Sequence, residues 1–342
     1  MEGKKLNYFT KYILKKLKWY IIVFFVALFL NFYLPRLIPG NPISGLVAQL
    51  TGPGTDASQA NQMHQTFVKE FGLDKSIPVQ FFNYVKMLFQ GSMGTSFSFY
   101  PKSVNSIVAE ALPWTLILQV PAFTIGWILG NTLGAISAYK KGAVDHILFP
   151  FSLYINAIPR YAFGMLLMWI FGIILGWFPL AGGYSSSMAP HLSWTFISNA
   201  ASHYLLPFLS VMLVTVGGQA IGMREMSIYE LDSDYVLYSR SLGIKDSKIV
   251  QFVFKNASLP QITAFGSSLP ILITGAVVTE VVFSYPGIGS LLFDAIRQSD
   301  YALIQGCTLV IILSVVFANF TLDILYGFID PRVRTAQMEE VE

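Results

Sequence analysis

Six long apolar stretches constrain this chain more than any other feature of its sequence. They cover roughly residues 19–38, 112–138, 147–178, 205–222, 260–284 and 302–328. A helix needs about 20 mostly apolar residues to cross the hydrocarbon core of a bilayer, so each stretch predicts a membrane span. The composition agrees, because 54% of the residues are apolar and only 12% are charged, about half the usual charged fraction. The sequence therefore predicts an all-α polytopic membrane protein with six transmembrane helices, and it excludes a disordered chain, a nucleic-acid binder and an ordinary cytosolic enzyme.

The third stretch is too long for one straight helix. Asn156, Pro159 and Arg160 lie near its start, and a proline inside a helix removes one backbone hydrogen bond and clashes with the preceding turn. We therefore expect a break at this point, with an interfacial piece before Pro159 and the span itself from Tyr161 to Phe178.

Positive charges predict the orientation of the spans. Six lysines precede the first stretch, which lacks a small-residue cleavage site and so is expected to be a retained signal-anchor helix. Further lysines and arginines gather at Lys140 and Lys141, in the loop 223–259, and at Arg332 and Arg334, whereas the short outer loops hold only Arg297. Because basic residues favour the cytoplasmic side, both termini are predicted to be cytoplasmic.

These assignments divide the chain into five parts. They are a basic cytoplasmic tail at 1–18, the first transmembrane helix at 19–38, a long extracytoplasmic segment at 39–105, a transmembrane domain at 106–331 that carries the cytoplasmic loop 223–259, and a cytoplasmic tail at 332–342. In the extracytoplasmic segment, apolar residues at helical spacing from Phe81 to Phe89 predict a short amphipathic helix. It would lie on the outer membrane surface or pack over the ends of the spans.

Small residues recur at every fourth position of the second stretch. They are Ala122, Gly126, Gly130, Gly134 and Ala138, which places them on one face of a helix. In lipid, such a face lets another backbone come close. We favour packing within this chain, with a dimer contact as the alternative.

The chain has few groups that could perform chemistry. Its four histidines are far apart without metal-ligand spacing, and its single cysteine, Cys307, excludes a disulfide framework and a thiolate zinc site. It has no phosphate-binding glycine-rich loop ending in Gly-Lys-Ser/Thr. We therefore expect no cofactor or metal on this chain and no enzyme activity, so that any chemistry that drives this protein would come from a partner.

Two acids lie within the predicted spans. Glu280 is near the outer end of the fifth span, and Asp323 is toward the inner end of the sixth. Buried ionisable groups often mark transport pathways or partners. For Glu280 a functional role and a solvated headgroup position both stay open, whereas for Asp323 a structural hydrogen bond is favoured.

The loop 223–259 is far more polar than the rest of the chain. Residues that begin, turn or end helices follow one another here: Asp232 or Ser233, Gly243, Asp246 or Ser247, and Pro260. The first pair can cap a helix to about Leu242, the glycine allows a turn, the second pair can cap a helix to about Asn256, and the proline opens the next span. We call residues 232–260 the elbow. Its apolar residues would dock a soluble subunit or rest on the elbow's own helix ends.

Residues 234–260 of the elbow resemble the coupling-loop signature of permease subunits of ATP-binding-cassette (ABC) importers. Gly243 and Leu259-Pro260 match that signature, with serines in place of its usual alanines. Asp234-Tyr235-Val236, Arg240 and Asn256 further resemble the dipeptide/oligopeptide (peptide/nickel) branch. The resemblance implies that an ATPase docks on the following residues: Asp234, Tyr235, Ser239, Arg240, Ser241, Gly243, Ile244, Asn256, Leu259 and Pro260.

Other motifs of that branch follow in order along the chain. The residues that resemble these motifs are 38–42, 71–75, 91–96, 112–116, Glu280 with 283–289, Asp300-Tyr301, Asn319, Asp323 and 330–332. The resemblance thus adds Asp300 and Asn319 to Glu280 and Asp323 as intramembrane or interfacial polar candidates.

The resemblance also implies partners. They would be a second, homologous permease subunit, two cytosolic ATPases that bind ATP-Mg, an extracytoplasmic solute-binding protein and the lipid of a prokaryotic cell membrane, with no nucleic acid. Closure of the ATPases would push on the elbow and switch a central cavity between inward and outward access. The solute would be a di- or oligopeptide, or alternatively a nickel complex or glutathione, and export is a rare variant. Two rivals, an ion-coupled secondary transporter and a membrane-embedded enzyme, would need intramembrane charge pairs or convergent acids and histidines, which are sparse here.

Overall fold

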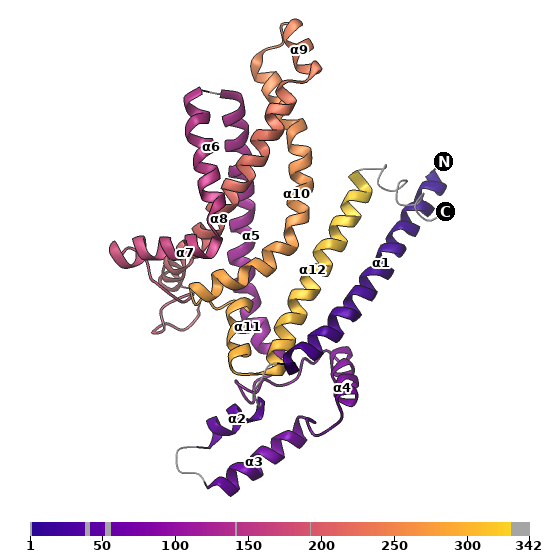
Figure 1. Cartoon of the computed structure of the whole chain (residues 1–342), viewed down its shortest axis with the longest axis vertical. Helices are drawn as coiled ribbons and strands as arrows, with labels where there is room; N and C mark the ends of the chain where they lie inside the picture. The colour runs from indigo at the N-terminus through magenta and orange to yellow at the C-terminus, as the bar shows by residue number, and fades with distance from the viewer. Residues whose placement is uncertain (1, 38–41, 52–55, 141, 192, 330–342) are drawn as a thin grey trace. The chain divides into compact units, whose positions relative to one another are not determined.

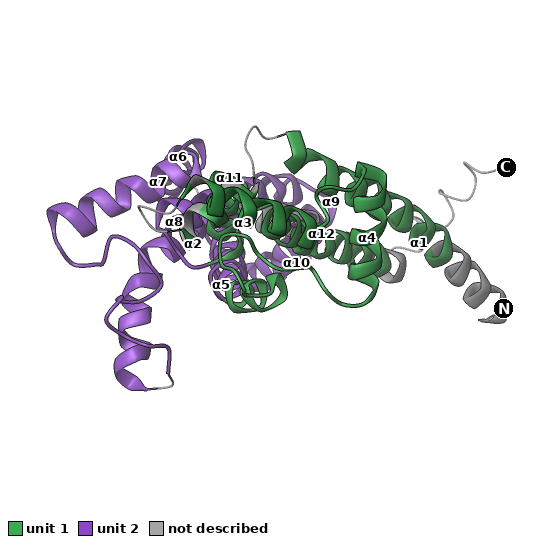
Figure 2. Cartoon of the chain, turned by 90° about the horizontal axis from the view of Figure 1, so that it is seen from below, with its two compact units in different colours: residues 1–113, 287–342 green, residues 114–286 purple. Residues whose placement is uncertain are grey.

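The computed structural model describes the backbone of residues 2–37, 42–51, 56–140, 142–191 and 193–329, and this part of the chain is helical with irregular connections (Figure 1). Inter-residue contacts divide the chain into two compact units (Figure 2). Unit 1 comprises residues 1–113 and 287–342, and unit 2 comprises residues 114–286. The predicted motifs at 38–42 and 330–332 fall mostly or wholly outside the described residues.

Two long helices form the frame of unit 1. Helix α1 (Glu2–Tyr33) packs against α12 (Tyr301–Ile329). The Tyr20 hydroxyl bonds Asp323 near one end of the pair, and the Asn31 amide bonds the Gln305 carbonyl near the other. The two helices are therefore antiparallel, so that the start of α1 and the end of α12 lie at the same end (Figure 1).

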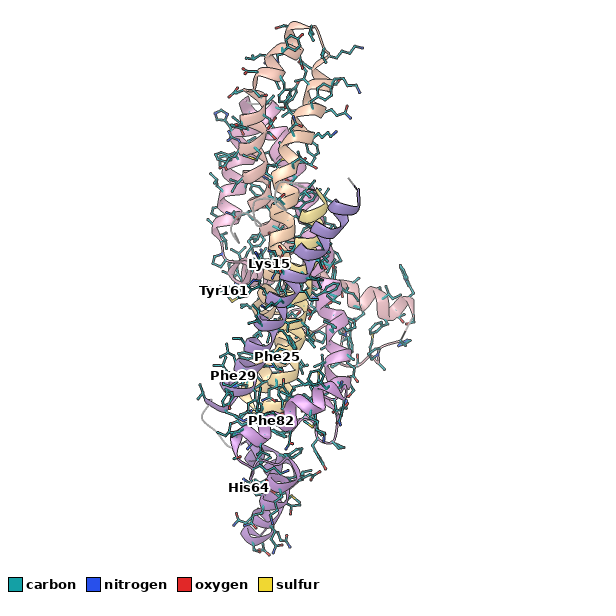
Figure 3. The ribbon with its side chains drawn as sticks, turned by 90° about the vertical axis from the view of Figure 1, so that its right-hand side faces the viewer. Lys15, Phe25, Phe29, His64, Phe82 and Tyr161 are labelled. Atoms are coloured by element: carbon teal, nitrogen blue, oxygen red, sulfur yellow. The ribbon has the colours of Figure 1, made fainter. Side chains whose placement is uncertain are left out.

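Short helices complete unit 1. They are η1 (Leu34–Leu37), α2 (Pro42–Leu50), α3 (Ala57–Glu70), α4 (Ile77–Phe89) and α11 (Ile288–Arg297). Helix α4 is the amphipathic helix expected near 81–89, and its Tyr84 is buried with Leu28 and Phe32 of α1. Phe82 of α4 stays exposed, as do Phe25 and Phe29 of α1 (Figure 3). Only one side of α4 is therefore covered within unit 1.

Unit 2 is built around α8 (Trp194–Leu231). Helices α6 (Gly142–Ala157), α7 (Arg160–Leu167) and α10 (Asp246–Val282) all pack against it. Helix α5 (Val104–Lys140) enters unit 2 at Trp114, and η2 (Met168–Ile174) continues α7 as a π-helix. The short α9 (Asp234–Ser241) links α8 to α10.

The break expected in the third stretch is present, but the helical structure beyond it is shorter than expected. The chain bends by 102° between α6 and α7, at Ile158 and Pro159. The piece before Pro159 forms α6, which packs along α8, and its place at the membrane interface stays a prediction. A side chain at Gly217 of α8 would lie only 2.9 Å from the Ser152 carbonyl oxygen, so the glycine is what lets α6 approach. Beyond the break, helical structure ends at Ile174 and not at Phe178.

Four helices in the described part of the chain are long and apolar enough to span a membrane, and the bent α6–α7 pair would make five. They are Ile13–Leu37, Val104–Lys140, Trp194–Leu231 and Tyr301–Ile324. The fifth expected span, 260–284, falls mostly in α10, where the side chains of residues 267 and 269–276 lie outside the described residues. Helix α10 runs without interruption through Pro260. The expectation that Pro260 opens a new helix is therefore wrong, because a proline within a long apolar helix removes only one backbone bond, which its surroundings can compensate.

Candidate functional site

The elbow has the helix–glycine–helix form expected from the sequence. Helix α8 ends at Leu231, α9 occupies Asp234–Ser241, and α10 begins at Asp246. The capping differs from expectation. Ser233 precedes α9, but its hydroxyl donates to the Glu230 carbonyl at 2.5 Å, and Lys245 is the residue before α10.

Gly243 makes the turn through a left-handed backbone. Its φ is +71°, and no heavy atom lies within 4 Å of the position that a Cβ would take. The Gly243 amide donates to the Arg240 carbonyl at 3.0 Å, and the Ile244 amide to the Ser239 carbonyl at 3.1 Å. This paired pattern closes the end of a helix and requires a left-handed residue, for which glycine has the least steric cost.

An apolar core holds the two arms of the elbow together. Val236 of α9 is fully buried and contacts a cluster that contains Ile249 and Val253 of α10. Leu231 at the end of α8 and Ala138 near the end of α5 complete the cluster. Residues of α5, α8, α9 and α10 thus share one apolar core. Because α9 is packed into this core, it has little freedom to move by itself.

Tyr235 adds a polar tie to this core. Its hydroxyl donates to the Glu230 carboxylate at 2.8 Å, which joins α9 to the end of α8. Burial and this hydrogen bond raise the pKa of Tyr235, whereas the nearby Asn256 amide of α10 acts in the opposite direction.

The outer side of α9 and the residue after it expose three large side chains. Leu237, Tyr238 and Leu242 are 56%, 66% and 60% exposed, although Val236 and Ser239 on the inner side are buried. Of the expected docking residues, Ser239 is buried, and Tyr235, Ile244 and Asn256 are half-buried. The exposed ones are Asp234, Arg240, Ser241, Gly243, Leu259 and Pro260. Sequence reasoning did not single out Leu237, Tyr238 and Leu242 as the outward face, because Val236 beside them is equally apolar.

The small-residue face of α5 lies against α8 within unit 2. A Cβ on Gly126 would lie 2.8 Å from the Met212 carbonyl oxygen, and one on Gly130 would lie 2.7 Å from that of Val216. One on Gly134 would overlap the carbonyl oxygen of Ala220. Ala122 is buried in a cluster with residues of α8, and Ala138 belongs to the core of the elbow.

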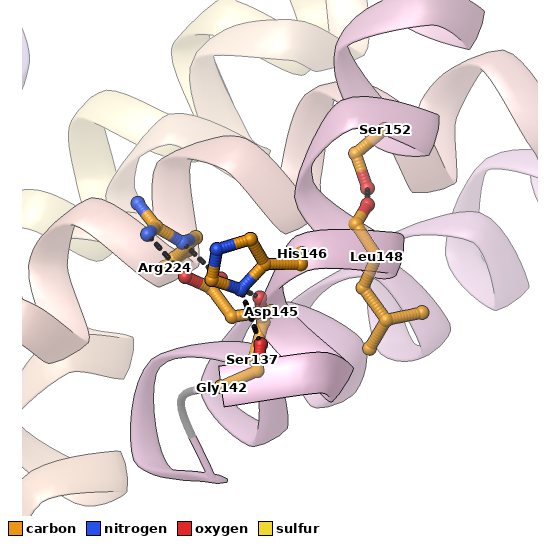
Figure 4. Close-up of polar contacts among 7 residues, drawn as sticks. All are labelled: Ser137, Gly142, Asp145, His146, Leu148, Ser152 and Arg224. Carbon is orange, nitrogen blue, oxygen red and sulfur yellow. Dashed lines mark hydrogen bonds and ion pairs between the residues drawn. The ribbon is translucent and has the colours of Figure 1, made fainter.

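An ion pair joins three helices close to the elbow (Figure 4). Arg224 of α8 donates to both carboxylate oxygens of Asp145 of α6, at 2.6 and 2.7 Å. The Ser137 hydroxyl of α5 donates to the same carboxylate at 2.5 Å, and the guanidinium lies 4.1 Å from the centre of the Phe149 ring. We call Ser137, Asp145 and Arg224 the clamp. The sequence analysis missed it, because nothing local in the sequence connects an aspartate and an arginine 79 residues apart.

The polar candidates occupy separate local networks. Asp300, which is buried, accepts hydrogen bonds from the Ser96 hydroxyl at 2.5 Å and from the Ser98 and Leu303 amides at 2.9 and 3.0 Å. Asp323 accepts from Tyr20 at 2.6 Å and lies 3.2 Å from the Lys16 ammonium.

Glu280 and Asn319 differ in their surroundings. Glu280 is fully buried at the end of α10, and its carbonyl accepts from the Tyr285 amide at 2.8 Å. Burial, with Tyr204 and Glu280 nearby, raises the pKa of Tyr285. Asn319 is half-buried in α12. In the described part of the chain, no three histidine, cysteine, aspartate or glutamate residues gather as a metal site would require.

Comparisons with known proteins agree with this architecture. The family described as binding-protein-dependent transport system inner membrane component matches residues 130–335. The di/tripeptide transport system permease protein DppB of Pseudomonas aeruginosa is 32% identical over 339 residues, which cover 94% of this chain and 98% of the relative. The oligopeptide permease protein OppB of Haemophilus influenzae is 30% identical, with 95% and 99% covered. The glutathione transport system permease protein GsiC of Pectobacterium atrosepticum is 31% identical, with 96% and 99% covered.

These matches extend over nearly the whole chain and include the elbow and the helices beneath it. They confirm the resemblance seen in the sequence, and they agree with the long apolar helices of a multi-pass plasma-membrane protein. The chain therefore belongs to the family of binding-protein-dependent transport system inner membrane components, in the branch of dipeptide and oligopeptide ABC permease subunits.

Proposed function

We propose that this chain forms half of the translocation pathway of an ATP-driven importer of short peptides. A second permease subunit would form the other half, two cytosolic ATPases would hydrolyse ATP-Mg, and an extracytoplasmic binding protein would deliver the solute. The chain itself would hold no cofactor and catalyse no reaction.

The observation that carries this proposal is the construction of the elbow. Its inner side packs against the ends of α5 and α8, and its outer side exposes Leu237, Tyr238 and Leu242. Exposed large apolar residues gathered on a polar loop are typical of a protein–protein contact. A rigid element with such a face could transmit movement of a bound ATPase into the spans. An ATPase that binds the inward-open and outward-open states with different affinities would then shift the equilibrium between them.

The expected orientation fits the same scheme. If the start of α1 and the end of α12 lie in the cytoplasm, positive charges and the elbow share that side. The ATPases would then reach the elbow, and the segment that holds α2, α3 and α4 would face the binding protein.

Short peptides are the solute class that we favour. The relatives are named for di/tripeptides, oligopeptides and glutathione, and glutathione is itself a small peptide. The rival scheme, ion coupling through this chain, needs an acid free to exchange protons. Asp323 is instead engaged by Tyr20 and Lys16, which supports a structural role.

Purification of the tagged chain from its native membrane tests the composition of the assembly. We expect mass spectrometry to find a second permease-like chain and two ATPases with phosphate-binding loops. Reconstituted with the binding protein in vesicles, the assembly should take up short peptides only when ATP is supplied. A chain that purifies alone and moves solute without ATP would refute the proposal and favour ion coupling.

Substitution at the turn tests the role of the elbow. Gly243→Trp should uncouple ATP hydrolysis from uptake while the chain still inserts into the membrane. Gly176→Trp is the matched control, because Gly176 has a φ of +62° and no heavy atom within 4 Å of its Cβ position, but lies outside the elbow. Normal uptake by Gly243→Trp would contradict the proposed lever.

A further inference from the structure

The clamp and the core of the elbow share one short piece of α5. Ser137 bonds Asp145 in the clamp, and the next residue, Ala138, is buried in the elbow core with Val236 of α9. A displacement of α9 would therefore reach α5 at the position where the clamp holds it.

The clamp is also close to the elbow along α8. Arg224 precedes the last residue of this helix, Leu231, by seven positions, or about 10 Å of helix at 1.5 Å per residue. Leu231 belongs to the same apolar core as Ala138. The elbow is thus connected to the clamp through two helices: α8, which ends just before the elbow, and α5, whose Ala138 packs against it.

The clamp fixes orientation in a way that the apolar contacts cannot. Two parallel hydrogen bonds from a guanidinium to a carboxylate define both distance and angle, and the Phe149 ring covers the guanidinium. The carboxylate and guanidinium side chains are 20% and 19% exposed, so the pair is largely shielded from solvent. Apolar packing is less directional and permits sliding.

We propose that Asp145 and Arg224 are positioning residues for coupling, which hold α5, α6 and α8 as one body so that movement of the elbow reaches the spans. This inference rests on the proposed function. The close approach of α5 to α8 at Gly126, Gly130 and Gly134 keeps the helices packed without the ion pair. Loss of the clamp should therefore leave folding and subunit docking unchanged, while more ATP is hydrolysed for each peptide transported.

The test measures ATP hydrolysis and peptide uptake in the same vesicles, with the complete assembly. The variants are Asp145→Asn, Arg224→Gln, Arg224→Lys and the exchange of both charges, Asp145→Arg with Arg224→Asp. Lys16→Gln is the matched control, because it breaks an ion pair of unit 1. The two neutral variants should raise the ATP used per peptide about fivefold or more, the lower end of typical coupling between sites. Arg224→Lys should lie between them and the unchanged chain, since an ammonium cannot form the bidentate pair.

The charge exchange separates coupling from mere stability. We expect it to bring the ATP used per peptide back to within about twofold of the unchanged chain. A factor of two is well below the roughly fivefold lower end of typical coupling between sites. Equal recovery of the ATPases with every variant is also expected. An unchanged ATP-to-peptide ratio in both neutral variants would overturn the inference, whether or not less assembly is recovered. So would an exchanged variant as uncoupled as the single ones. Absence of ATP-dependent uptake by the unchanged assembly would instead refute the proposed function itself.

Discussion

Alanine at Gly134 should destabilise this protein, whereas alanine at Gly222 should not. Both glycines lie in long helices of unit 2. A Cβ on Gly134 would overlap the Ala220 carbonyl and lie 3.0 Å from the Arg224 amide nitrogen. The nearest atoms to a Cβ on Gly222 would be those of the Gln261 side-chain amide, at 3.4 Å. The obstacle at Gly134 is backbone, which cannot rotate away, and the neighbour at Gly222 is a flexible side chain.

The magnitude follows from two opposing terms. Replacing glycine by alanine within a helix contributes about 0.5–1 kcal/mol of stability in either variant. Overpacking at Gly134 costs about 1–3 kcal/mol, because α5 and α8 must separate to admit the methyl group. The two variants should therefore differ by about 1–3 kcal/mol. For a unit of this size, that corresponds to roughly 2–12 °C in melting temperature.

Thermal unfolding of the purified chain in detergent, followed by tryptophan fluorescence, measures this difference. Gly130→Ala serves as an intermediate case, because its Cβ would lie 2.6 Å from the Gln219 Cβ and 2.7 Å from the Val216 carbonyl oxygen. The expected order of melting temperatures is Gly222→Ala highest and Gly134→Ala lowest. If Gly134→Ala melts at or above Gly222→Ala, the close contact between α5 and α8 is not present in the membrane protein.

Three further predictions concern single elements. Gly243→Asn should retain coupled peptide uptake and Gly243→Val should lose most of it, because asparagine tolerates a left-handed backbone and a β-branched residue does not; uptake per ATP in vesicles measures this. Leu237→Ser and Tyr238→Ser should each lower recovery of the ATPases with the tagged chain and leave the melting temperature unchanged, since both side chains are exposed; an unchanged recovery would place the docking face elsewhere. Asp300→Ala should destabilise unit 1 by about 1.5–3 kcal/mol, because it removes hydrogen bonds to a buried charged group, and faster proteolysis of residues 94–103 would report it.

Much of the helical architecture could be predicted because it follows from local rules. Length and apolar content located the long helices, and a single glycine between two expected helical segments located the turn of the elbow. The exception at Pro260 is instructive. A proline ends most helices in water, where the freed carbonyl is easily solvated. In a long apolar helix, breaking further backbone hydrogen bonds would cost much more free energy. Helix α10 therefore continues through Pro260.

The position and the turn of the elbow could be predicted from the sequence, but which side of α9 is buried and which is exposed could not. Val236 and Leu237 are adjacent apolar residues of α9, yet the first is fully buried and the second is 56% exposed. Helix α9 is only eight residues long, too short for its periodicity alone to tell which side meets the body of the protein. That choice depends on Ile249, Val253 and Ala138, which come from other helices.

At the end of α5, the spacing of small residues predicts which face of the helix packs closely, but not which groups this face contacts. The four-residue spacing selected Gly134 and Ala138, and it passed over Ser137, which lies on the same side of the helix at the intervening i+3 position. In the structure, these three neighbours meet three different groups. Gly134 meets the backbone of α8, Ser137 meets the carboxylate of the clamp, and Ala138 meets the core of the elbow. A face that seemed to serve only close packing thus also joins the elbow to the clamp, and for this reason we expect substitutions there to affect coupling as well as stability.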